Sequence, residues 1–591
     1  MKHFTSLALA AALLVSSAVA QAQTAPAAEW AKFVTGETTT GTGTIGIATN
    51  ESGTATYWAG SIATKAVGDK GFYDGEAVFE SPAATERTNN NLVVLGINSA
   101  GTTVWKAYTN YADVISNNGG VVIMPDNSIV IAALVRHDPL TLDKEIVFYD
   151  ATGAKISMIP AVAEYHNIPM LIHLTPEGKY IDGGYVNVDV PTIGETVVRA
   201  GVTIDGITAS PDGCVLIYGN QRVTFNFYKE DGSAKIFGVS DETLEGWDGD
   251  PQKEAGSMYI LKLHTNGEYI NINRGLGSGF TNGHISNAVF DKDGTLYIYG
   301  KYSVVEGASS YDGHLTGTTT TFSQNGVSNL FIARSNTNIT YIRWVKNIIG
   351  EKVNNSCIVQ NSGLTLGNGN LWLAAQYSGK FYPEGDDSKA IQSTLKVREG
   401  MLVRFDPVTG DWIKGISSYD SFTANGLTAY QDAIITPKAA DKIYVFGYMM
   451  NAATGVFLRG YDVETLKADT DNAWSLVTGV KGEGFNAAVP LAFNLAYSPK
   501  TGTIFTDARG KGGMCAAGLP AASSGTAFGI QLAKFQLDQS IFGSVSDITV
   551  DSDENAPVEY YDLQGRRVSD TPAAGLYIRR QGTRVTKVLV R

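Results

Sequence analysis

Short apolar segments separated by polar turns run along most of the chain. The repeating unit is an apolar segment, a tight turn and then a strand with an apolar residue at every second position. This is the pattern of a hairpin with one buried face. Copies of this first hairpin lie at residues 46–61, 121–135, 207–220, 288–301, 364–377, 433–448 and 495–509. The pattern predicts an all-β protein built from repeats.

The spacing of the turn residues gives the length of the repeat. The central positions of a two-residue hairpin turn adopt positive φ, which favours glycine, asparagine and aspartate. These positions are Gly53, Asn127, Gly213, Gly294, Gly369, Asp441 and Gly502, separated in turn by 74, 86, 81, 75, 72 and 61 residues. Such spacing suits a four-stranded unit with long connections.

A second hairpin alternates with the first. Its copies lie at residues 92–106, 145–156, 258–270, 330–345 and 401–414, with looser copies at 456–467 and 530–541. Two hairpins make four strands, and about seven such units around an axis leave only short edges. The sequence therefore predicts a β-propeller of about seven blades over residues 29–543, with two stacked β-sandwiches as the rival fold.

Residues 162–257 depart from the pattern because they hold two further hairpin-like segments, 171–186 and 223–237. An eighth blade or an inserted hairpin would explain them. Seven blades are favoured, because the 35 residues from Gly178 to Gly213 are too few for a whole blade.

Residues 29–33 are predicted to be the missing outer strand of the last blade. Trp30 matches Trp105, Trp344 and Trp412, which stand at the ends of outer hairpins. Pairing of this segment with residues 530–542 would close the ring by joining both ends of the chain.

The clearest repeat, residues 259–272 followed by 283–300, is similar to the bacterial β-propeller repeat family of the SBBP type. The similarity extends over residues 30–541. It implies the propeller fold and no single activity.

The two ends of the chain carry targeting features. Residues 1–22 have a basic start, an apolar run and small residues at the end, which predicts a secretory signal peptide. Residues 544–557 form an acidic linker, and residues 558–591 hold seven Arg and Lys against three acids in three apolar stretches, which predicts a small antiparallel β module. No later segment is long enough to span a membrane.

The C-terminal module resembles the type A C-terminal sorting domain of the Bacteroidetes type IX secretion system, through residues 561–568, 575–578 and 587–591. The resemblance implies a secretion machinery as partner. We therefore expect a protein that is secreted or held at the outer-membrane surface of a Gram-negative bacterium.

Composition excludes several functions. A net charge of −13 and a pI near 5.1 repel a phosphate backbone, so no nucleic-acid partner is expected. Cys214, Cys357 and Cys515 are isolated, and the seven histidines show no metal-ligand spacing. The nucleophile-elbow motif is absent. We predict no metal and no cofactor, and the interpretation leans away from an enzyme.

One three-residue pattern recurs in the connections between hairpins. An aromatic residue, Asp and Gly stand together at Tyr73-Asp74, Trp247-Asp248 and Tyr311-Asp312, and the connection at 378–400 adds Phe381 and Tyr382. Such exposed aromatics and acids suit stacking on sugar rings or gripping a protein. The alternative is a repeat-encoded turn whose aromatic packs on its own blade.

The long connections at 61–91, 239–257, 303–329 and 378–400 should share one face, because hairpin turns occupy the other end of each blade. The predicted function is a secreted or surface-attached binding protein with an extracellular glycan or protein ligand. A propeller glycosidase or polysaccharide lyase is one alternative. A structural adhesin or scaffold is the other.

Overall fold

The computed structural model is built of strands, with a single turn of 3-10 helix at Asp387–Lys389 in its described part. It describes residues 26–590 except 39–40, 83–87, 138–143, 162–165, 189–191, 194–195, 198–201, 222–224, 230–231, 233–234, 240–256, 265–268, 275–279, 305–311, 316–317, 322, 324, 337–338, 340, 395–397, 419–427, 436–440, 450–454, 480–490, 540, 543–557, 563–565, 569–574 and 582–583. The predicted signal peptide, residues 1–22, and the whole predicted acidic linker, residues 544–557, lie outside these residues.

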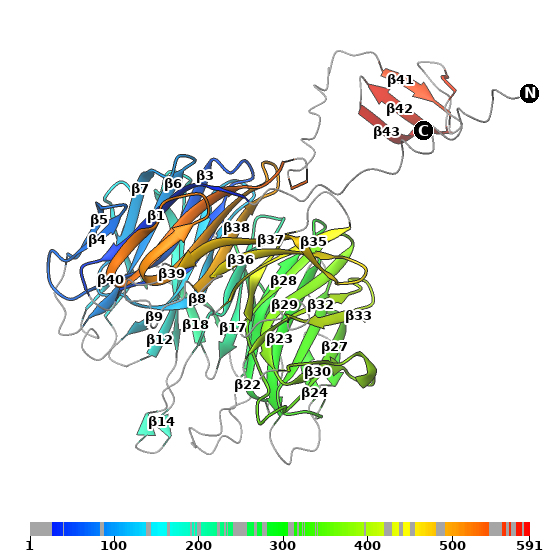
Figure 1. Ribbon diagram of the computed structural model, residues 1–591, viewed down its shortest axis with the longest axis horizontal. Helices are drawn as coiled ribbons and strands as arrows, with labels where there is room; N and C mark the ends of the chain where they lie inside the picture. The colour runs from blue at the N-terminus through cyan, green and yellow to red at the C-terminus, as the bar shows by residue number, and fades with distance from the viewer. Residues whose placement is uncertain are drawn as a thin grey trace, which may run out of the picture.

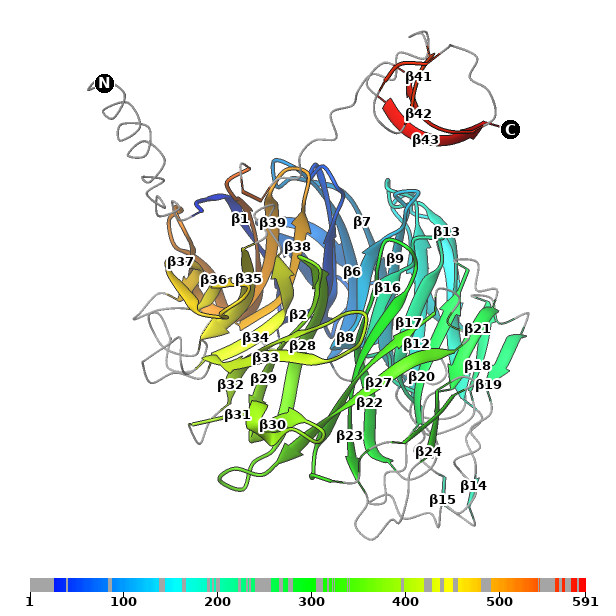
Figure 2. The same cartoon turned by 90° about the vertical axis from the view of Figure 1, so that its right-hand side faces the viewer.

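Seven blades surround a central axis, with strands β2, β8, β28 and β34 near the centre of Figure 2. Each innermost strand contacts that of the next blade, and the last contacts the first, so the ring is closed. The prediction of a seven-bladed propeller is confirmed. The innermost strands are β2 (Thr42–Thr49), β8 (Asp113–Ile123), β16 (Gly206–Ala209), β22 (Phe280–Phe290), β28 (Ile358–Gly367), β34 (Thr428–Ile435) and β38 (Leu491–Ser498).

Three further antiparallel strands complete each blade. They are β3 (Ala55–Thr64), β6 (Asn89–Asn98) and β7 (Thr103–Thr109) in blade 1; β9 (Ile129–His137), β12 (His166–Leu174) and β13 (Tyr180–Val188) in blade 2; β17 (Val215–Gln221), β20 (Ser257–Leu263) and β21 (Tyr269–Arg274) in blade 3; β23 (Leu296–Val304), β26 (Asn329–Ser335) and β27 (Ile342–Glu351) in blade 4; β29 (Asn370–Ser378), β32 (Glu399–Phe405) and β33 (Trp412–Ser417) in blade 5; β35 (Lys442–Met449), β36 (Val456–Asp462) and β37 (Ala468–Gly479) in blade 6; and β39 (Thr503–Ala516), β40 (Ala522–Gln536) and β1 (Ala28–Gly36) in blade 7.

The hairpin turns have the backbone that the repeat pattern predicts. Their φ angles lie between 64° and 85° at Gly53, Asn127, Gly213, Gly294, Gly369 and Gly502. These turns all stand at one end of the blades, here named the turn face. The opposite end, where strands cross from one hairpin to the next, is named the connection face.

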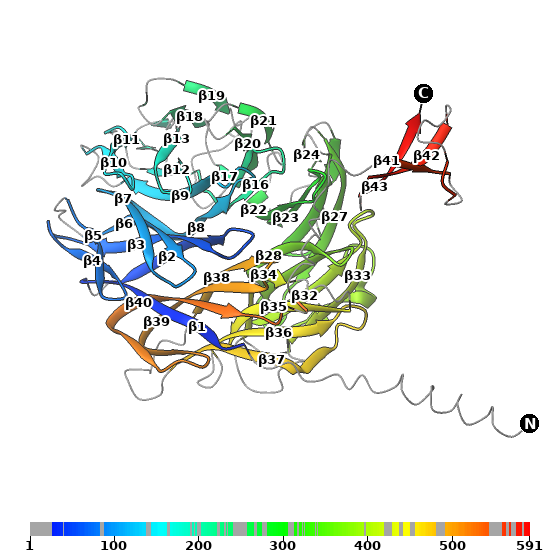
Figure 3. The ribbon, with the colours of Figure 1, turned by 90° about the horizontal axis from the view of Figure 1, so that it is seen from above.

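The N-terminal strand closes the ring. Strand β1 pairs antiparallel with β40, from Ala28 opposite Phe535 to Val34 opposite Ile530. In Figure 3 the dark blue β1 lies beside the orange β40. The predicted closure is confirmed, and the fourth strand of the last blade comes from the start of the chain.

The irregular stretch after residue 138 holds no eighth blade. Segment 171–186 belongs to the outer hairpin of blade 2, β12 and β13, although the sequence pattern places that hairpin at 145–156. Residues 145–156 instead form β10 (Ile146–Tyr149) and the start of β11 (Lys155–Ile159), which extend blade 1 through β7. That assignment was wrong because alternation reports a half-buried hairpin and not the sheet edge it joins.

The same device recurs around the ring. Strands β18 (Phe225–Lys229) and β19 (Lys235–Val239) extend blade 2, β30 (Lys380–Pro383) and β31 (Ile391–Gln392) extend blade 4, and β4 (Lys70–Tyr73) and β5 (Glu76–Glu80) extend blade 7. Each hairpin lies in the connection of one blade and covers the outer edge of the preceding blade. Covered edges cannot pair with another chain.

Two ribbons and the tail stand apart from the blades. The ribbons are β14 (Thr192–Ile193) with β15 (Thr196–Val197), and β24 (Asp312–Leu315) with β25 (Thr318–Thr321). The tail forms a three-stranded sheet of β41 (Val558–Tyr561), β42 (Gly575–Gln581) and β43 (Arg584–Val590), whose strands pair only with one another (Figure 1).

Tryptophans on the fourth strands of three blades tie neighbouring blades together at the turn face. Each donates its indole N–H to a backbone oxygen in a hairpin turn of the next blade: Trp30 to Ser99 at 3.1 Å, Trp105 to Pro176 at 2.9 Å and Trp344 to Val408 at 2.8 Å. Trp412, which the sequence pattern groups with these three, packs on Phe405 of its own blade instead.

A glycine in each receiving turn makes room for the indole ring. Gly101, Gly178 and Gly410 have φ of +79°, +81° and +76°, and a Cβ on any of them would lie 2.5 to 2.7 Å from a tryptophan ring atom. Glycine is therefore required at these positions for two reasons: it adopts the positive φ, and it lets the indole ring approach closely.

We predict that Gly101→Ala destabilises the propeller more than Gly153→Ala does. Gly153 has nearly the same φ, +83°, but a Cβ added there would meet no heavy atom within 4 Å, so both variants carry the backbone cost of about 1–2 kcal/mol. Gly101→Ala also displaces Trp30, which adds about 1–3 kcal/mol. Chemical denaturation measures the difference, and equal losses would show that the Trp30 contact contributes nothing.

Candidate functional site

The long connections all leave the blades at the connection face. They join the second strand of a blade to the third, as between β3 and β6, β17 and β20, β23 and β26, and β29 and β32. In three of these four connections, hairpins that cover blade edges take up part of the length, whereas the connection from β23 to β26 holds the separate ribbon of β24 and β25. This changes the position of the aromatic residues that the sequence singled out.

Tyr73 is buried and does not face a ligand. Strand β4 runs down the outer edge of blade 7, and the Tyr73 hydroxyl donates to the Gly101 carbonyl oxygen at 2.9 Å, at the turn face. Burial, together with the charge of Asp74, raises the pKa of Tyr73. The expectation that this aromatic is exposed was wrong, because its strand completes a neighbouring blade.

Asp74 and Gly75 form the turn between β4 and β5, with φ of 52° and 84°. Asp74 is exposed, and its carboxylate pairs with Lys32 of β1. The structure agrees with the alternative only in part: the residues form a turn and the aromatic is buried, but Tyr73 lies on the edge of blade 7 and not on the blade of its own repeat.

Phe381 and Tyr382 lie on β30, at the outer edge of blade 4. Phe381 is fully buried, so the expectation that it is exposed was also wrong. The half-buried Tyr382 donates its hydroxyl to Glu351 at 2.6 Å, and this bond to a carboxylate raises the pKa of Tyr382 to about 12. Lys380 lies 4.7 Å from the centre of the Tyr382 ring.

The other candidates are not brought to these positions. Trp247, Asp248 and Tyr311 lie outside the described residues, and Asp312 is the first residue of β24. The four candidates with described side chains divide between the edges of blades 7 and 4 and form no common site.

A pocket of about 320 Å³ opens instead at the connection face, between blades 7, 1 and 2. It is formed by strand ends remote from the hairpin turns: Thr42 begins β2, Asn90 follows the start of β6, and Arg136 is near the end of β9. Its lining residues are Gly41, Thr42, Gly43, Ser61, Asn90, Asp113, Val114, Ile115, Arg136 and Arg509. Sequence reasoning missed this site.

Hydrogen bonds organise one side of the pocket. The Asn90 side-chain amide donates to Asp113 Oδ1 at 2.9 Å, and the Arg136 guanidinium lies 3.6 Å from Asp113 Oδ2. Asp113 is buried, whereas Arg136 is partly exposed. Arg136 and Asp113 are opposite each other in the hairpin of β8 and β9, and both line the pocket.

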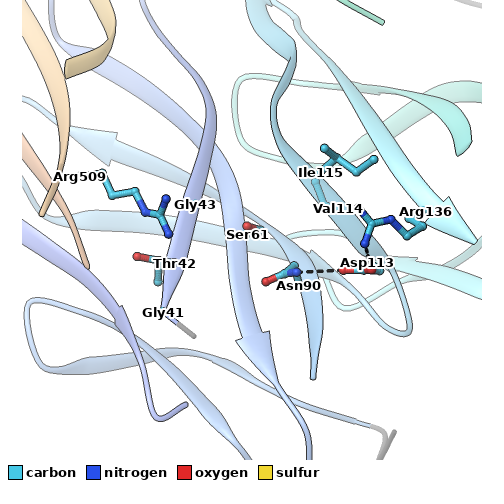
Figure 4. Close-up of a pocket in the computed structure, with 10 residues that line it drawn as sticks. All are labelled: Gly41, Thr42, Gly43, Ser61, Asn90, Asp113, Val114, Ile115, Arg136 and Arg509. Carbon is cyan, nitrogen blue, oxygen red and sulfur yellow. Dashed lines mark hydrogen bonds and ion pairs between the residues drawn. The ribbon is translucent and has the colours of Figure 1, made fainter. Parts of the chain in front are cut away.

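Arg509 stands on the opposite side, with Thr42, Ser61 and Asn90 between the two arginines (Figure 4). Its guanidinium lies 4.6 Å from the centre of the Phe528 ring, and its Nε is buried without a hydrogen-bond partner. Burial lowers the pKa of Arg509, yet a guanidinium stays charged at any physiological pH. Two guanidinium groups and one carboxylate give the lining a net positive charge.

A buried carboxylate beneath the pocket joins blades 7 and 1. Asp507 accepts hydrogen bonds from the Thr44 hydroxyl at 2.5 Å, the Asn494 backbone N–H at 2.7 Å and the Asn494 side-chain amide at 2.9 Å. Trp58 in turn donates to Thr44 at 3.2 Å. These bonds fix the strand that carries Arg509, two residues further along.

A sequence signal for such polar positions existed. Gly213 and Asn220, Gly294 and Lys301, Gly369 and Gln376, and Gly502 and Arg509 are each seven residues apart, so polar residues interrupt the same apolar strand at the same repeat position. Asn220 and Gln376 are buried, while Lys301 and Arg509 are half-buried. A polar residue at this repeat position either lines a pocket, as Arg509 does, or ties two blades together, as Asn220 does by donating to the Gly283 carbonyl oxygen at 2.5 Å.

Blade 2 holds a chain of groups that resembles a hydrolytic triad. His173 Nε2 lies 2.8 Å from Ser128 Oγ, and His173 Nδ1 lies 3.1 Å from Asp182 Oδ1. However, the Ser128 hydroxyl donates to Asp126 at 2.6 Å, and Ser128 is only 4% exposed. A buried serine whose proton is already bound to a carboxylate is not an activated nucleophile, so this network holds the turn together.

The described residues offer little other chemistry. Among them, no three His, Cys, Asp or Glu side chains converge as a metal site would require, and no helix is long and apolar enough to span a bilayer. The three cysteines are free. Burial raises the pKa of Cys214 to about 11 and of Cys357 to about 12, so neither is an activated thiolate.

No family model and no curated protein matches the sequence. Among solved structures, the chain is similar to polysaccharide lyase Uly1 at 11% identity and a TM-score of 0.39, over 82% of this chain and 88% of that one. A protein of unknown function from Dyadobacter fermentans has 10% identity and a TM-score of 0.30, over 87% and 99% of the two chains. Similarities of this extent say nothing about what this chain binds.

We predict that Tyr73→Phe lowers the free energy of unfolding by about 0.5–1.5 kcal/mol, because the variant leaves the Gly101 carbonyl without its buried donor. Tyr341→Phe is the control, since Tyr341 is exposed and its loss should change stability by less than about 0.5 kcal/mol. Urea unfolding measures both. If the two variants behave alike, the Tyr73 bond is not structural.

Proposed function

We propose that this protein is exported to the outer-membrane surface or beyond, where its propeller binds an acidic glycan at the pocket between blades 7, 1 and 2. One observation carries the proposal. In a chain of net charge −13, the pocket lining bears two arginines and a single acid, and neither a hydrogen bond nor an ion pair satisfies Arg509 among the described residues.

The lining chemistry suits a sugar that carries a carboxylate. Guanidinium groups bind carboxylates through two parallel hydrogen bonds, whereas Thr42, Ser61, Asn90 and Asp113 offer the hydroxyl, amide and carboxylate groups that pair with sugar hydroxyls. The volume is at the lower end for small-molecule sites, so the pocket takes one sugar unit of a longer chain.

Binding is favoured over hydrolysis by the acid count. A glycosidase needs two carboxylates on either side of the scissile bond. Asp113 is the one carboxylate in the pocket lining that the structure describes. If no sugar binds, the remaining function is that of a protein scaffold without a small ligand.

Export rests on the two ends of the chain. Residues 1–22 have the features of a secretory signal peptide, and residues 558–591 resemble a type IX sorting domain. The tail forms its own sheet, as a separately recognised address would require.

We predict that Arg509→Gln and Arg136→Gln each weaken the binding of oligogalacturonate about ten- to a hundredfold, because a charge-assisted hydrogen bond is worth about 1.5–3 kcal/mol. Thermal stability should hold in Arg509→Gln, since the substitution removes a buried Nε that has no partner. Titration calorimetry at low salt measures the affinity, and differential scanning calorimetry the stability.

The matched control is Lys346→Gln, which removes one positive charge from the turn face. The Lys346 side chain is 42% exposed, and its partner among the described residues is Asp411, at 2.9 Å, so its loss should leave affinity unchanged. Methyl-esterified oligogalacturonate keeps the hydroxyls but loses the charge. Equal binding of the ester, or equal loss in all three variants, would contradict a specific role for the pocket.

Deletion of residues 558–591 should leave the thermal transition of the propeller unchanged, since β41, β42 and β43 pair with no blade. In the native host the same deletion should retain the protein inside the outer membrane. Calorimetry and cell fractionation measure the two effects. A large loss of stability would make the tail part of the core, and normal export would remove its sorting role.

A further inference from the structure

A second group of ionisable side chains lies between blades 3 and 4. His284 on β22 places its Nδ1 2.8 Å from Asp205 Oδ2, and Asp205 precedes the first strand of blade 3. Lys301 on β23 is directly opposite His284 in the sheet register. These three residues, here named the blade 3–4 cluster, belong to no pocket described above.

The register orients the cluster. Residues directly opposite each other in an antiparallel pair project from the same side of the sheet. Because His284 reaches Asp205 of blade 3, Lys301 also lies on the side of blade 4 that faces blade 3. The charge of Asp205 acts on Lys301, opposing the effect of burial, which lowers the pKa of that lysine.

The cluster also lies at the connection face. Lys301 is three residues from the end of β23, and Asp205 immediately precedes β16, so both are remote from the hairpin turns. This is the face on which the pocket of Arg136 and Arg509 opens. In the repeat, Lys301 has the same position as Arg509, seven residues after the turn glycine.

Two groups of the cluster remain open to a ligand. Within the described part of the chain, neither Nε2 of His284 nor the Lys301 ammonium group has a hydrogen-bond partner, and the His284 side chain is 28% exposed. His173 differs, since both of its ring nitrogens are occupied and it is buried. An interblade tie alone would require only the Asp205–His284 bond.

The bond to Asp205 determines what His284 offers. With the Nδ1 proton donated to the carboxylate, a neutral imidazole presents Nε2 as an acceptor. Lys301 supplies charged donors beside it. An acceptor for a hydroxyl next to a donor for a carboxylate matches a sugar that carries both groups.

We propose that Asp205, His284 and Lys301 form a second subsite, which binds another uronic-acid unit of the same glycan chain. Lys301 binds the carboxylate, His284 accepts from a hydroxyl, and Asp205 is a positioning residue. This inference rests on the proposed function, because it needs an acidic chain anchored at the first pocket.

The test uses the full mature chain with short and long oligogalacturonates in calorimetry at neutral pH. Lys301→Gln removes the charge. His284→Asn keeps a side-chain amide donor where Nδ1 bonds Asp205 but removes the nitrogen at Nε2. Each should weaken binding of long oligomers about three- to tenfold and leave binding of the shortest bound oligomer unchanged, while Lys346→Gln changes neither.

The outcomes separate the two proposals. The second subsite is supported if Lys301→Gln and His284→Asn weaken the binding of long oligomers and leave the binding of short ones unchanged. If Arg136→Gln and Arg509→Gln weaken binding but Lys301→Gln and His284→Asn match the unaltered protein at every length, the second subsite is wrong and the first stands. If the unaltered protein does not distinguish oligogalacturonate from its methyl ester, both are overturned. A variant that loses the calorimetric unfolding transition is replaced by Lys301→Met.

Discussion

The pairing of β1 with β40 holds the ring closed, and the rest of the structure depends on it. Each blade buries its faces only against two neighbours, so an open ring would leave two sheets half exposed. Residues 28–34 supply the strand that prevents this, and they also bring Trp30 to the first blade. The same indole-to-turn contact then repeats at blades 1 and 4, which spreads the constraint around the ring.

Much of the length of the long connections forms hairpins that cover blade edges. Four hairpins within them cover the outer strands of blades 7, 1, 2 and 4. This use explains why Tyr73 and Phe381 are buried although they stand in connections of a length usual for binding loops. The open chemistry of the connection face lies nearer the axis, on the ends of the inner strands.

The charged side chains at the open ends of the inner strands are mostly positive, although the chain as a whole is negative. Arg136 and Arg509 line the pocket, and Lys301 of blade 4 has the same repeat position as Arg509 of blade 7, while the protein as a whole is acidic. Arg509 is half-buried, and its Nε has no hydrogen-bond partner among the described residues, which costs free energy that packing does not recover. Positions where a sequence departs from the locally stable choice are typical of functional sites.

Local pattern by itself determined the repeat, its seven inner hairpins, the turn residues and the closing strand, because alternation and positive-φ turns are properties of a few consecutive residues. It could not assign residues 145–156 to an edge, since two hairpins with the same alternation compete for one partner strand. It also could not bring Asp113, Arg136 and Arg509 into one pocket, or His284 beside Asp205. Asp113 and Arg136 are opposite each other in the hairpin of β8 and β9, but Arg509 comes from blade 7, and Asp205 and His284 come from blades 3 and 4, so only the closed ring sets those distances.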